Sequence, residues 1–570
     1  MHYIKLIGLV CFTIGLLSGC TRQSADLILV NGKIVTVDDA RPEVQAVAVS
    51  NGRILAVGSD EAIRNYATES TQVIDLDGAL AIPGLIESHG HFTSLGRSKL
   101  GLDLVNVKNW DEIVDMVGKA AQQAEPGVWI IGRGWHQEKW NKAPRPNVDG
   151  LPVHNALSRV SPDNPVLLVH ASGHACIANA KAMTLAGVTG DIPNPPGGEI
   201  VKDRQGHPIG VFRETAQELI ERIQAHDFQN RSAEQINNEN RRIVELATEE
   251  CLRHGITSFH DMGSSFETID FFRQLADEGK LGIRLNVMIM EDNEALTERI
   301  TDYKWIGYGD NHLTVRGIKR LIDGALGSHG AWLLEPYDSM PSSVGLNTEP
   351  VDAMKEAARI AIENGFQLST HAIGDRANRE TLNIYEEAFR NHPAKRDLRW
   401  RIEHAQHLHP DDIPRFGKLG VIASMQAIHC TSDGPWVYKR LGKKRAEEGA
   451  YVWRKLMETG AVISNGTDVP VEAVDPIACY HAAVTRRLKD GTLFFPDQCM
   501  TREEALRTYT MNGAYAAFEE ELKGSLSPGK LADITVLSKD ILTVPEEEIL
   551  DTDVLYTIVG GRVLYQKADK

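Results

Sequence analysis

Residues 82–91 read IPGLIESHGH, an apolar run that ends in two histidines. Such a run is typical of a buried strand, and side chains two positions apart on a strand lie on the same face. His89 and His91 could therefore contact one ion, and Gly90 between them leaves room for it. Taken alone the pattern is weak, because core or surface histidines explain an HxH sequence more often than a metal does.

The same pattern, an apolar run that ends in a polar side chain, recurs further along the chain. Four more apolar runs end in a polar side chain, namely Lys319, His371, His404 and Asp468. In a parallel barrel the carboxyl ends of all strands open onto one mouth, so these side chains would meet there. Two pairs of histidines and a carboxylate are ligands of the kind that zinc accepts. Together these strand ends favour a shared metal site much more than any one of them does.

The long middle of the chain predicts an α/β barrel. Apolar runs alternate with helical stretches, such as 353–364, which precedes a strand at 366–370. This alternation is typical of parallel strands with crossover helices. The sequence contains nine strand-like runs, one more than the eight strands of such a barrel. If Lys319 closes the fourth strand, the run at 166–170 lies outside the barrel, and residues 92–250 form a long insertion after the first strand.

Both chain ends carry short alternating apolar runs cut by turns. Asn31-Gly32 and Asn51-Gly52 are typical of two-residue hairpin turns, and Gly560-Gly561 separates two runs near the C-terminus. We therefore expect residues 21–82 and 524–570 to form one small β domain beside a barrel at 83–523.

Composition excludes several classes of function. The chain has 570 residues and 61 Lys and Arg against 78 Asp and Glu, so its net charge is −17. This balance argues against nucleic acid as a partner, because phosphates require a basic surface. A mean hydropathy of −0.25 and 42% hydrophobic residues exclude a membrane bundle and a disordered chain. Without a CxxC pair, we expect buried thiols at Cys176, Cys251, Cys430, Cys479 and Cys499.

Short segments in a fixed order carry a family resemblance. They are NGKI at 31–34, PGLIESHGH at 83–91, IDGAL at 322–326, HAIGD at 371–375, EH at 403–404, MQ at 425–426, GTD at 466–468, GSL at 524–526 and PGKLAD at 528–533. With this set the chain resembles the amidohydrolase superfamily over nearly its whole mature length. It is most similar to the branch of N-substituted formamide deformylase and exoenzyme regulatory proteins. The family fold, a (β/α)8 barrel with a small composite β-sandwich, agrees with the pattern of apolar runs.

The resemblance implies a role for the residues at the strand ends. His89 and His91 would hold the more buried metal, and His371 and His404 would hold a second one. Asp468 would ligate the buried metal and accept the proton of the attacking water.

Lys319 stands where the family often carries an N-carboxylated lysine. A carboxylated lysine is an anion that can bridge two ions, whereas a plain ammonium has only donors. The alternative is an unmodified lysine in an ion pair, because the modification is invisible in a sequence. The implied cofactor is a divalent metal, zinc in the first place, as one or two ions.

These features predict a metal-dependent hydrolase that cleaves a non-peptide C–N bond in a small-molecule amide or cyclic amide. A metal makes hydroxide available at neutral pH, and Asp468 would pass the proton to the leaving nitrogen. Ester or phosphoester hydrolysis uses the same chemistry. The non-enzymatic alternative is a membrane-anchored ligand-binding or regulatory lipoprotein on this scaffold. The presence of all six site residues argues against that alternative. We also expect that two copies of the chain form a homodimer.

The insertion is expected to select the substrate, because loops at a barrel mouth usually set specificity. Trp129, Trp135 and Trp140 surround the segment GRG at 132–134. This arrangement predicts either an aromatic lid on glycine hinges or packing in a satellite core. His174 and Glu214 resemble family positions near the substrate and, with Trp135, are the substrate-binding candidates.

Other residues near the motifs are expected to be peripheral or depart from the family pattern. His407 and His409 follow His404 closely, and we expect them in a solvated loop rather than as ligands. His329 stands where relatives often have Arg, and Ala427 stands where Pro often follows Met-Gln. These departures concern the substrate contacts more than the metal ligands.

The first twenty residues read MHYIKLIGLVCFTIGLLSGC and predict a signal peptide. Lys5 precedes an apolar run that is too short to span a bilayer. The ending Leu17-Ser18-Gly19-Cys20 resembles a bacterial lipobox, in which cleavage leaves a lipid-bearing cysteine at the N-terminus. We therefore expect a lipoprotein held through Cys20 on the extracytoplasmic, periplasmic side of a membrane. The alternative is an ordinary secretory signal cleaved elsewhere.

The substitution Cys20→Ser should release the protein into the soluble fraction, because it removes the atom that would carry the lipid. Cys11→Ser, in the same leader, is the matched control and should leave the protein with the membranes. Immunoblots of membrane and soluble fractions measure the difference. Unchanged membrane association of the Cys20→Ser variant would refute lipidation at this residue.

Overall fold

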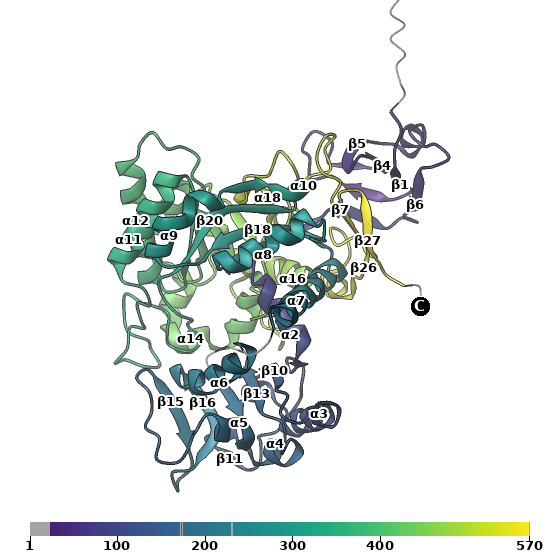
Figure 1. The fold of residues 1–570 in the computed structure, drawn as a ribbon. Helices are drawn as coiled ribbons and strands as arrows, with labels where there is room; N and C mark the ends of the chain where they lie inside the picture. Colours follow the sequence, from purple (N-terminus) through teal and green to yellow (C-terminus); the bar gives the residue numbers. More distant parts are fainter. Residues whose placement is uncertain (1–22, 172, 174, 230–231, 569–570) are drawn as a thin grey trace, which may run out of the picture.

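The fold is described from a computed structural model that covers residues 23–171, 173, 175–229 and 232–568 (Figure 1). The predicted signal peptide with Cys20 lies outside the described residues. Within the part of the chain that the structure describes, no helix has the length and apolar character needed to cross a membrane. The predicted thiols are free and, apart from the half-buried Cys499, they are buried, as expected: Cys176, Cys251, Cys430 and Cys479.

The middle of the chain forms a nearly closed parallel barrel. Its strands are ordered β24-β23-β22-β21-β20-β18-β17-β8. At the seam, Asp468 N–H donates to the His89 carbonyl at 2.8 Å, and His91 N–H donates to the Val469 carbonyl at 2.8 Å. The strands are β8 Leu85–Gly90, β17 Ile256–Ser264, β18 Arg284–Ile289, β20 Leu313–Leu321, β21 Gln367–Ala372, β22 Arg401–His404, β23 Ile422–Met425 and β24 Ile463–Asn465.

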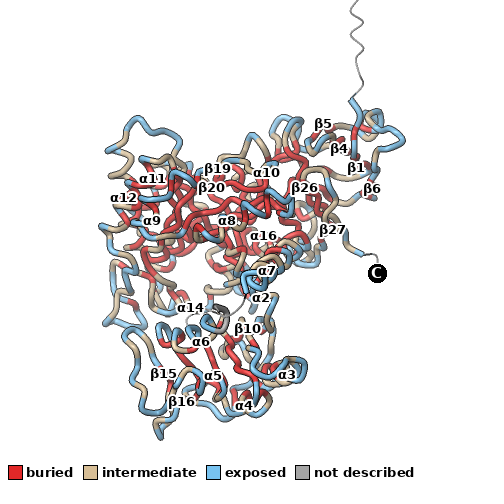
Figure 2. The backbone as a smooth tube through the Cα atoms, in the orientation of Figure 1, coloured by how far each residue is buried: buried red, intermediate tan, exposed pale blue. Residues whose placement is uncertain are grey.

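Amphipathic helices cover the outside of the barrel, and the strands between them are almost entirely buried (Figure 2). The helix expected at 353–364 is α11, Val351–Asn364, and Gly365 caps its C-terminus with a φ of +68°. Helix α12, Asp375–Asn391, buries one stripe of side chains against the sheet. Its Tyr385 hydroxyl donates to the Arg401 carbonyl at 2.8 Å and so ties the helix to β22.

The two chain ends form one small domain of two packed sheets. One sheet has the order β5-β4-β1-β6, and the other has the order β27-β26-β25-β7-β2-β3. In the second sheet, N-terminal β7 pairs antiparallel with C-terminal β25, so the domain is composite. The strands are β1 Leu27–Val30, β2 Lys33–Val35, β3 Glu43–Val44, β4 Ala46–Ser50, β5 Arg53–Gly58, β6 Gln72–Asp75, β7 Leu80–Pro83, β25 Ile534–Leu537, β26 Val554–Val559 and β27 Arg562–Gln566.

Two of the three turn dipeptides behave as predicted. Asn51-Gly52 joins β4 to β5, and Gly560-Gly561 joins β26 to β27, with positive φ at both positions of each turn. The hairpin predicted at Asn31-Gly32 is wrong, because β1 and β2 lie in different sheets. Gly32 is needed there for close packing instead, since a Cβ atom would lie 2.4 Å from Leu76 Cδ1.

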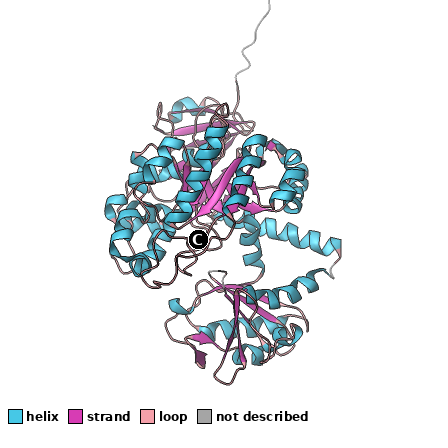
Figure 3. Cartoon of the chain, turned by 90° about the vertical axis from the view of Figure 1, so that its left-hand side faces the viewer, coloured by secondary structure: helices cyan, strands magenta, loops and turns pink. Residues whose placement is uncertain are grey.

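The run at 166–170 lies outside the barrel, as predicted, in strand β13 of the insertion. The insertion sheet has the order β15-β16-β14-β13-β10-β9. Figures 1 and 3 show the insertion as a separate body beneath the barrel. Its elements are β9 Leu102–Asp103, α3 Trp110–Gln123, β10 Ile130–Trp135, α4 Asn155–Val160, β13 Val166–His170, β14 Ala175–Ala178, α5 Ala180–Leu185, β15 Gly198–Lys202, β16 Pro208–Glu214 and α6 Glu218–Gln229. The next helix, α7 Ala233–Arg253, packs on the barrel, and its Val244, Ala247 and Cys251 lie in the barrel core.

A buried ion pair links the barrel to the composite domain. Arg284 of β18 contacts Asp533 through Nε–Oδ2 at 2.8 Å and Nη2–Oδ1 at 3.0 Å. Both side chains are only 4% exposed. Burial alone would raise the pKa of Asp533, but the Arg284 guanidinium holds it below its ordinary value.

Asp533→Asn should destabilise the protein by about 3–5 kcal/mol at pH 7, because Arg284 would stay buried without its counter-ion. The folded-state pKa of Asp533 is lowered, so its stabilisation is full above about pH 4 and is lost as the pH falls through that pKa. The variant should therefore lose less stability than the wild type between pH 5 and 3. Urea unfolding at several pH values measures both effects.

Asp39→Asn is the control for this prediction. Asp39 also pairs with an arginine, Arg507, but its side chain is 86% exposed. Its removal should cost less than about 1 kcal/mol, because exposed ion pairs contribute little. Equal losses in the two variants would contradict the role given to the Arg284–Asp533 pair.

Candidate metal centre

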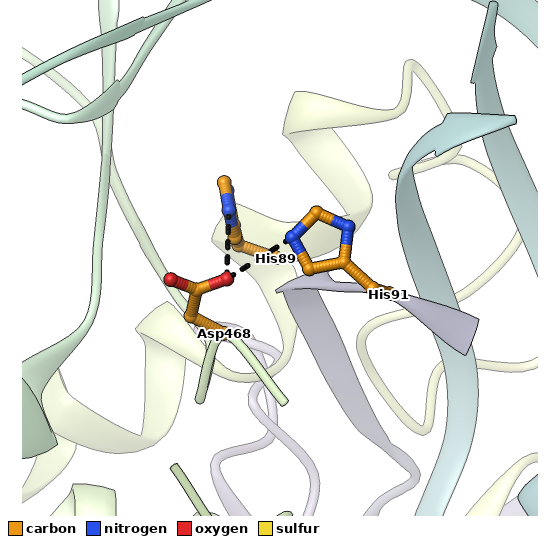
Figure 4. Close-up of side chains that lie close together, drawn as sticks. All are labelled: His89, His91 and Asp468. Atoms are coloured by element: carbon orange, nitrogen blue, oxygen red, sulfur yellow. Dashed lines mark ion pairs between the residues drawn. The ribbon is translucent and has the colours of Figure 1, made fainter. Parts of the chain in front are cut away.

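Three side chains from the barrel seam converge on one point (Figure 4). His89 and His91 come from the end of β8, and Asp468 follows β24. Asp468 Oδ1 lies 3.4 Å from His89 Nε2 and 3.3 Å from His91 Nε2. One ligand atom from each of the three residues lies within 4.8 Å of the other two. Burial favours the neutral acid, but His89 and His91 hold the pKa of Asp468 well below its ordinary value.

Two further predicted histidines complete the mouth. His404, at the end of β22, has its ring centroid 4.7 Å from that of His89 and 4.5 Å from that of His371. His371 lies in β21, next to β22 in the sheet. The structure therefore places all four predicted histidines around Asp468.

Lys319 of β20 lies at the same mouth and is only 2% exposed. Burial lowers the pKa of Lys319 to about 8, although the carboxylates of Glu403 and Asp468 oppose this shift. Among the described residues Lys319 forms no ion pair within 4.0 Å, and both alternatives for its state stay predictions. An amine with this pKa is partly neutral near pH 8.

Buried polar residues orient two of the imidazoles. His89 Nδ1 contacts Glu403 Oε2 at 2.6 Å, and Glu403 Oε1 lies 2.7 Å from Arg401 Nε. His404 Nδ1 lies 2.6 Å from Gln426 Oε1, which can only accept a hydrogen bond. Donation from Nδ1 in both rings leaves each Nε2 lone pair free to face the mouth.

The backbone of the site is strained. His404 has a φ of +73°, and Asp468 has a φ of +58°. Non-glycine residues in this region cost about 1–3 kcal/mol each and cluster at functional sites. Thr467, next to Asp468, is held by Glu87, whose Oε1 accepts from Thr467 N–H at 2.6 Å. Burial raises the pKa of Glu87 to about 8. These contacts hold Asp468 in the backbone conformation that points its carboxylate toward the histidines.

The residues fit a divalent metal. Asp468 Oδ1 has contacts of 3.3–3.4 Å with His89 and His91, and His371 Nε2 lies 3.4 Å from Asp323 Oδ1. These two atoms and His429 Nε2 are buried and form no hydrogen bond among the described residues. Buried polar atoms left in this state are costly, and a cation would satisfy them. A set of imidazole nitrogens and carboxylate oxygens is also the ligand chemistry that zinc accepts.

His429 is a site residue that the sequence analysis missed. It lies in α14, Ala427–Gly449, and its ring stacks on that of His404 with centroids 6.2 Å apart. His404, His429 and Asp468 form a second group with ligand atoms within 4.8 Å of one another. His429 follows the end of β23 by four residues, so a search of the loops after each strand would have found it.

Of the two alternatives for the tryptophans, the structure favours packing in a satellite core over an aromatic lid. Trp135 is fully buried in the insertion core, and its Nε1–H donates to the Leu168 carbonyl at 2.9 Å. Trp140 packs on it with ring centroids 6.1 Å apart, and the GRG segment lies inside strand β10. The structure thus favours core packing over substrate contact for Trp135. Trp129 is half-buried in a neighbouring apolar cluster.

The other two substrate-binding candidates lie at the edge of the insertion. Glu214 ends β16, is exposed, and has a φ of +48°. Gln217 Nε2 donates to both the Glu214 carbonyl and the Gly173 carbonyl, which links Glu214 to the loop after β13. His174 itself lies outside the described residues. A substrate contact for either residue stays a prediction.

The solvated loop predicted for His407 is wrong. His407 is only 2% exposed, and its N–H donates to the Ile373 carbonyl at 3.0 Å. The segment folds inward against Tyr451, whose ring centroid lies 5.6 Å from that of His407. His409 remains partly exposed, as expected.

The chain is similar to known proteins over nearly its whole length. A sequence profile of the amidohydrolase family matches residues 72–565. Protein LONG AFTER FAR-RED 3 of Arabidopsis thaliana is 33% identical, over 95% of this chain and 92% of its own length. N-substituted formamide deformylase of Arthrobacter pascens is 27% identical, over 96% and 99%. The crystal structure of an uncharacterized metal-dependent hydrolase from Pyrococcus horikoshii OT3 superposes with a TM-score of 0.74 at 26% identity, over 91% and 99%.

Glu403→Gln should weaken zinc binding about 10–100-fold, because the amide orients His89 less strongly and lowers its basicity. Competition with a chelator, followed by metal analysis, measures the affinity. Glu386→Gln is the control, since Glu386 also pairs with an arginine, Arg415, but on the barrel surface. Unchanged zinc affinity in the Glu403→Gln variant would contradict the orienting role.

Proposed function

The chain belongs to the amidohydrolase family and is a metal-dependent hydrolase acting on carbon–nitrogen bonds, and we propose that its substrates are N-acyl amines, N-formyl amines in particular. The observation that carries the proposal is the convergence of His89 and His91 on one buried oxygen of Asp468. The substrate class is supported by N-substituted formamide deformylase, which matches nearly end to end.

We propose zinc as the metal, as one or two ions. His89, His91 and Asp468 would hold one ion, and His371 and His404 would hold a second. When bound, the metal supplies a nucleophile from water at neutral pH and polarises the substrate carbonyl. The nitrogen-rich ligand set supports zinc over magnesium or calcium, which prefer oxygen ligands.

Lys319 is proposed to be N-carboxylated. Its buried amine has a pKa lowered to about 8, so a neutral fraction is available to react with carbon dioxide. An unmodified ammonium beside His371 would repel a cation, whereas the carbamate would attract one. The modification would therefore relieve an electrostatic conflict within the site.

Asp468 is proposed as the proton carrier. Its carboxylate stays ionised beside His89 and His91, so it can accept a proton from the attacking water. The same proton then passes to the leaving nitrogen. Because Asp468 is only 6% exposed, its proton is shielded from bulk water.

The location of the enzyme is also proposed from the leader sequence. A lipid on Cys20 would hold it at the extracytoplasmic face of a bacterial membrane. Cys20 lies outside the described residues, so the lipobox-like sequence LSGC is the support for this proposal.

Asp468→Asn should leave the metal content largely intact and lower kcat on N-formyl and N-acyl amines about 10²–10⁴-fold. Metal analysis of the purified protein and a screen of such amines against the wild type make the measurement. Asp39→Asn, on the surface of the composite domain, should keep full activity. Full turnover by Asp468→Asn would refute its role, and a wild type without bound transition metal would favour the ligand-binding lipoprotein.

A further inference from the structure

His429 is a buried histidine at the barrel mouth that the proposed reaction does not use. Its residue is only 9% exposed, and its Nε2 forms no hydrogen bond among the described residues. Asp468 Oδ2 lies 4.0 Å from this nitrogen. A buried imidazole nitrogen in this state is costly, so its position points to something that it binds.

One residue, Gln426, positions both His429 and its neighbour His404. The side-chain Oε1 of Gln426 lies 2.6 Å from His404 Nδ1, and its carbonyl accepts from His429 N–H at 3.1 Å. Gln426 is the N-cap of α14, and the next residue, Ala427, donates its N–H to Asn465 Oδ1 of β24 at 3.0 Å. The first turn of α14 is therefore fixed to the barrel, and His404 keeps Nε2 for a ligand.

A buried network one turn further along α14 holds the helix in this orientation. Asp433 follows His429 by four residues, so the two side chains lie on the same face of the helix. Asp433 Oδ2 accepts from Gln406 Nε2 at 2.7 Å and from the Tyr451 hydroxyl at 2.6 Å. Because Gln406 follows β22, these bonds tie α14 to the neighbouring strand end and keep His429 at the mouth.

The two oxygens of Asp468 face different imidazoles. Oδ1 lies 3.4 Å from His89 Nε2 and 3.3 Å from His91 Nε2, whereas Oδ2 faces His429. His404, His429 and Asp468 each offer an atom within 4.8 Å of the other two. The ligand atoms of one zinc ion lie about 3–4 Å apart, because each is about 2.0–2.2 Å from the metal. A shift of about 1 Å in one imidazole is therefore enough for His404 and His429 to contact the same ion.

The second ion of the proposed function lacks a third protein ligand that is independent of modification. His371 and His404 are two ligands, and Lys319 would be a third only when it is carboxylated. Catalytic zinc sites use three protein ligands and keep one position open. His429 would supply a third imidazole whatever the state of Lys319.

We propose that His429 is a ligand of the second ion, which it shares with His371 and His404. This inference rests on the proposed function, because it concerns the second ion of that site. The three histidines come from the ends of successive barrel strands, namely β21, β22 and the turn after β23. Oδ2 of Asp468 then stays beside the second ion and is free to accept the proton in the proposed reaction.

The test is zinc binding by the protein after a chelator has removed its metal, in competition with a chromophoric chelator. We expect the wild type to bind two ions in two steps. His429→Ala should lower the affinity for the second ion more than about 100-fold, because loss of an orienting partner alone costs about 10–100-fold. The affinity for the first ion should change less than about threefold, since its own ligands and their orienting partners stay in place.

His429→Gln is the second variant, because its longer side chain fills more of the space of the imidazole than alanine does. We expect the same loss of the second ion. Cobalt(II) in place of zinc gives a further readout, since its visible absorption depends on its ligands. The bands added by the second equivalent of cobalt should change in His429→Gln, and those of the first equivalent should not.

His409→Ala is the matched control. His409 also follows β22, but its side chain is 39% exposed and lies near Asp411 at 3.5 Å. Both zinc affinities should stay at their wild-type values in this variant. An equal loss of the second ion in the control would overturn the assignment to His429.

The zinc titration separates this inference from the proposed reaction, because it needs no substrate. If the wild type binds two ions and the second depends on His429, but no N-formyl or N-acyl amine is hydrolysed, the proposed reaction fails and the ligand role stands. If the wild type hydrolyses such amines with one ion only, the ligand role is overturned. It is also overturned if both His429 variants keep the second affinity and lose turnover alone, which would assign His429 to the substrate.

Discussion

The first and last strands of the barrel meet through two backbone hydrogen bonds near their carboxyl ends. Asp468 donates to the His89 carbonyl, and His91 donates to the carbonyl of Val469. These bonds are formed by His89, His91, Asp468 and Val469, so the contacts that close the barrel also bring the three side chains of the candidate metal centre together. The left-handed backbone of Asp468 is unfavourable on its own, and the buried contacts of Thr467 and Glu87 offset its cost.

Buried charged side chains surround this seam. Glu403 is ionised because Arg401 and His89 outweigh its burial, and it fixes which nitrogen of His89 faces the mouth. A carboxylate so close to the ligands balances part of the charge that an ion brings.

The sequence predicted those parts of the site that depend on local pattern. Lys319 and Asp468 could be found because an apolar strand that ends in a polar side chain is a local signal, and barrel topology gathers all such ends. The burial of His407 and the core position of Trp135 could not be found, since both depend on what packs against them. The hairpin prediction at Asn31-Gly32 was wrong for the same reason, because a turn dipeptide does not determine which sheet the next strand joins.

The pairing of β7 with β25 has a consequence for how the chain matures. The N-terminal strands are synthesised first, yet one edge of β7 has no partner until residues 534–537, on the far side of the barrel sequence, have been made. An unpaired edge is a site for aggregation, so the nascent chain depends on protection of that edge while the whole barrel is made. If translation stopped before residue 534, the edge of β7 that pairs with β25 would stay unpaired. Quality-control proteases could recognise this exposed edge.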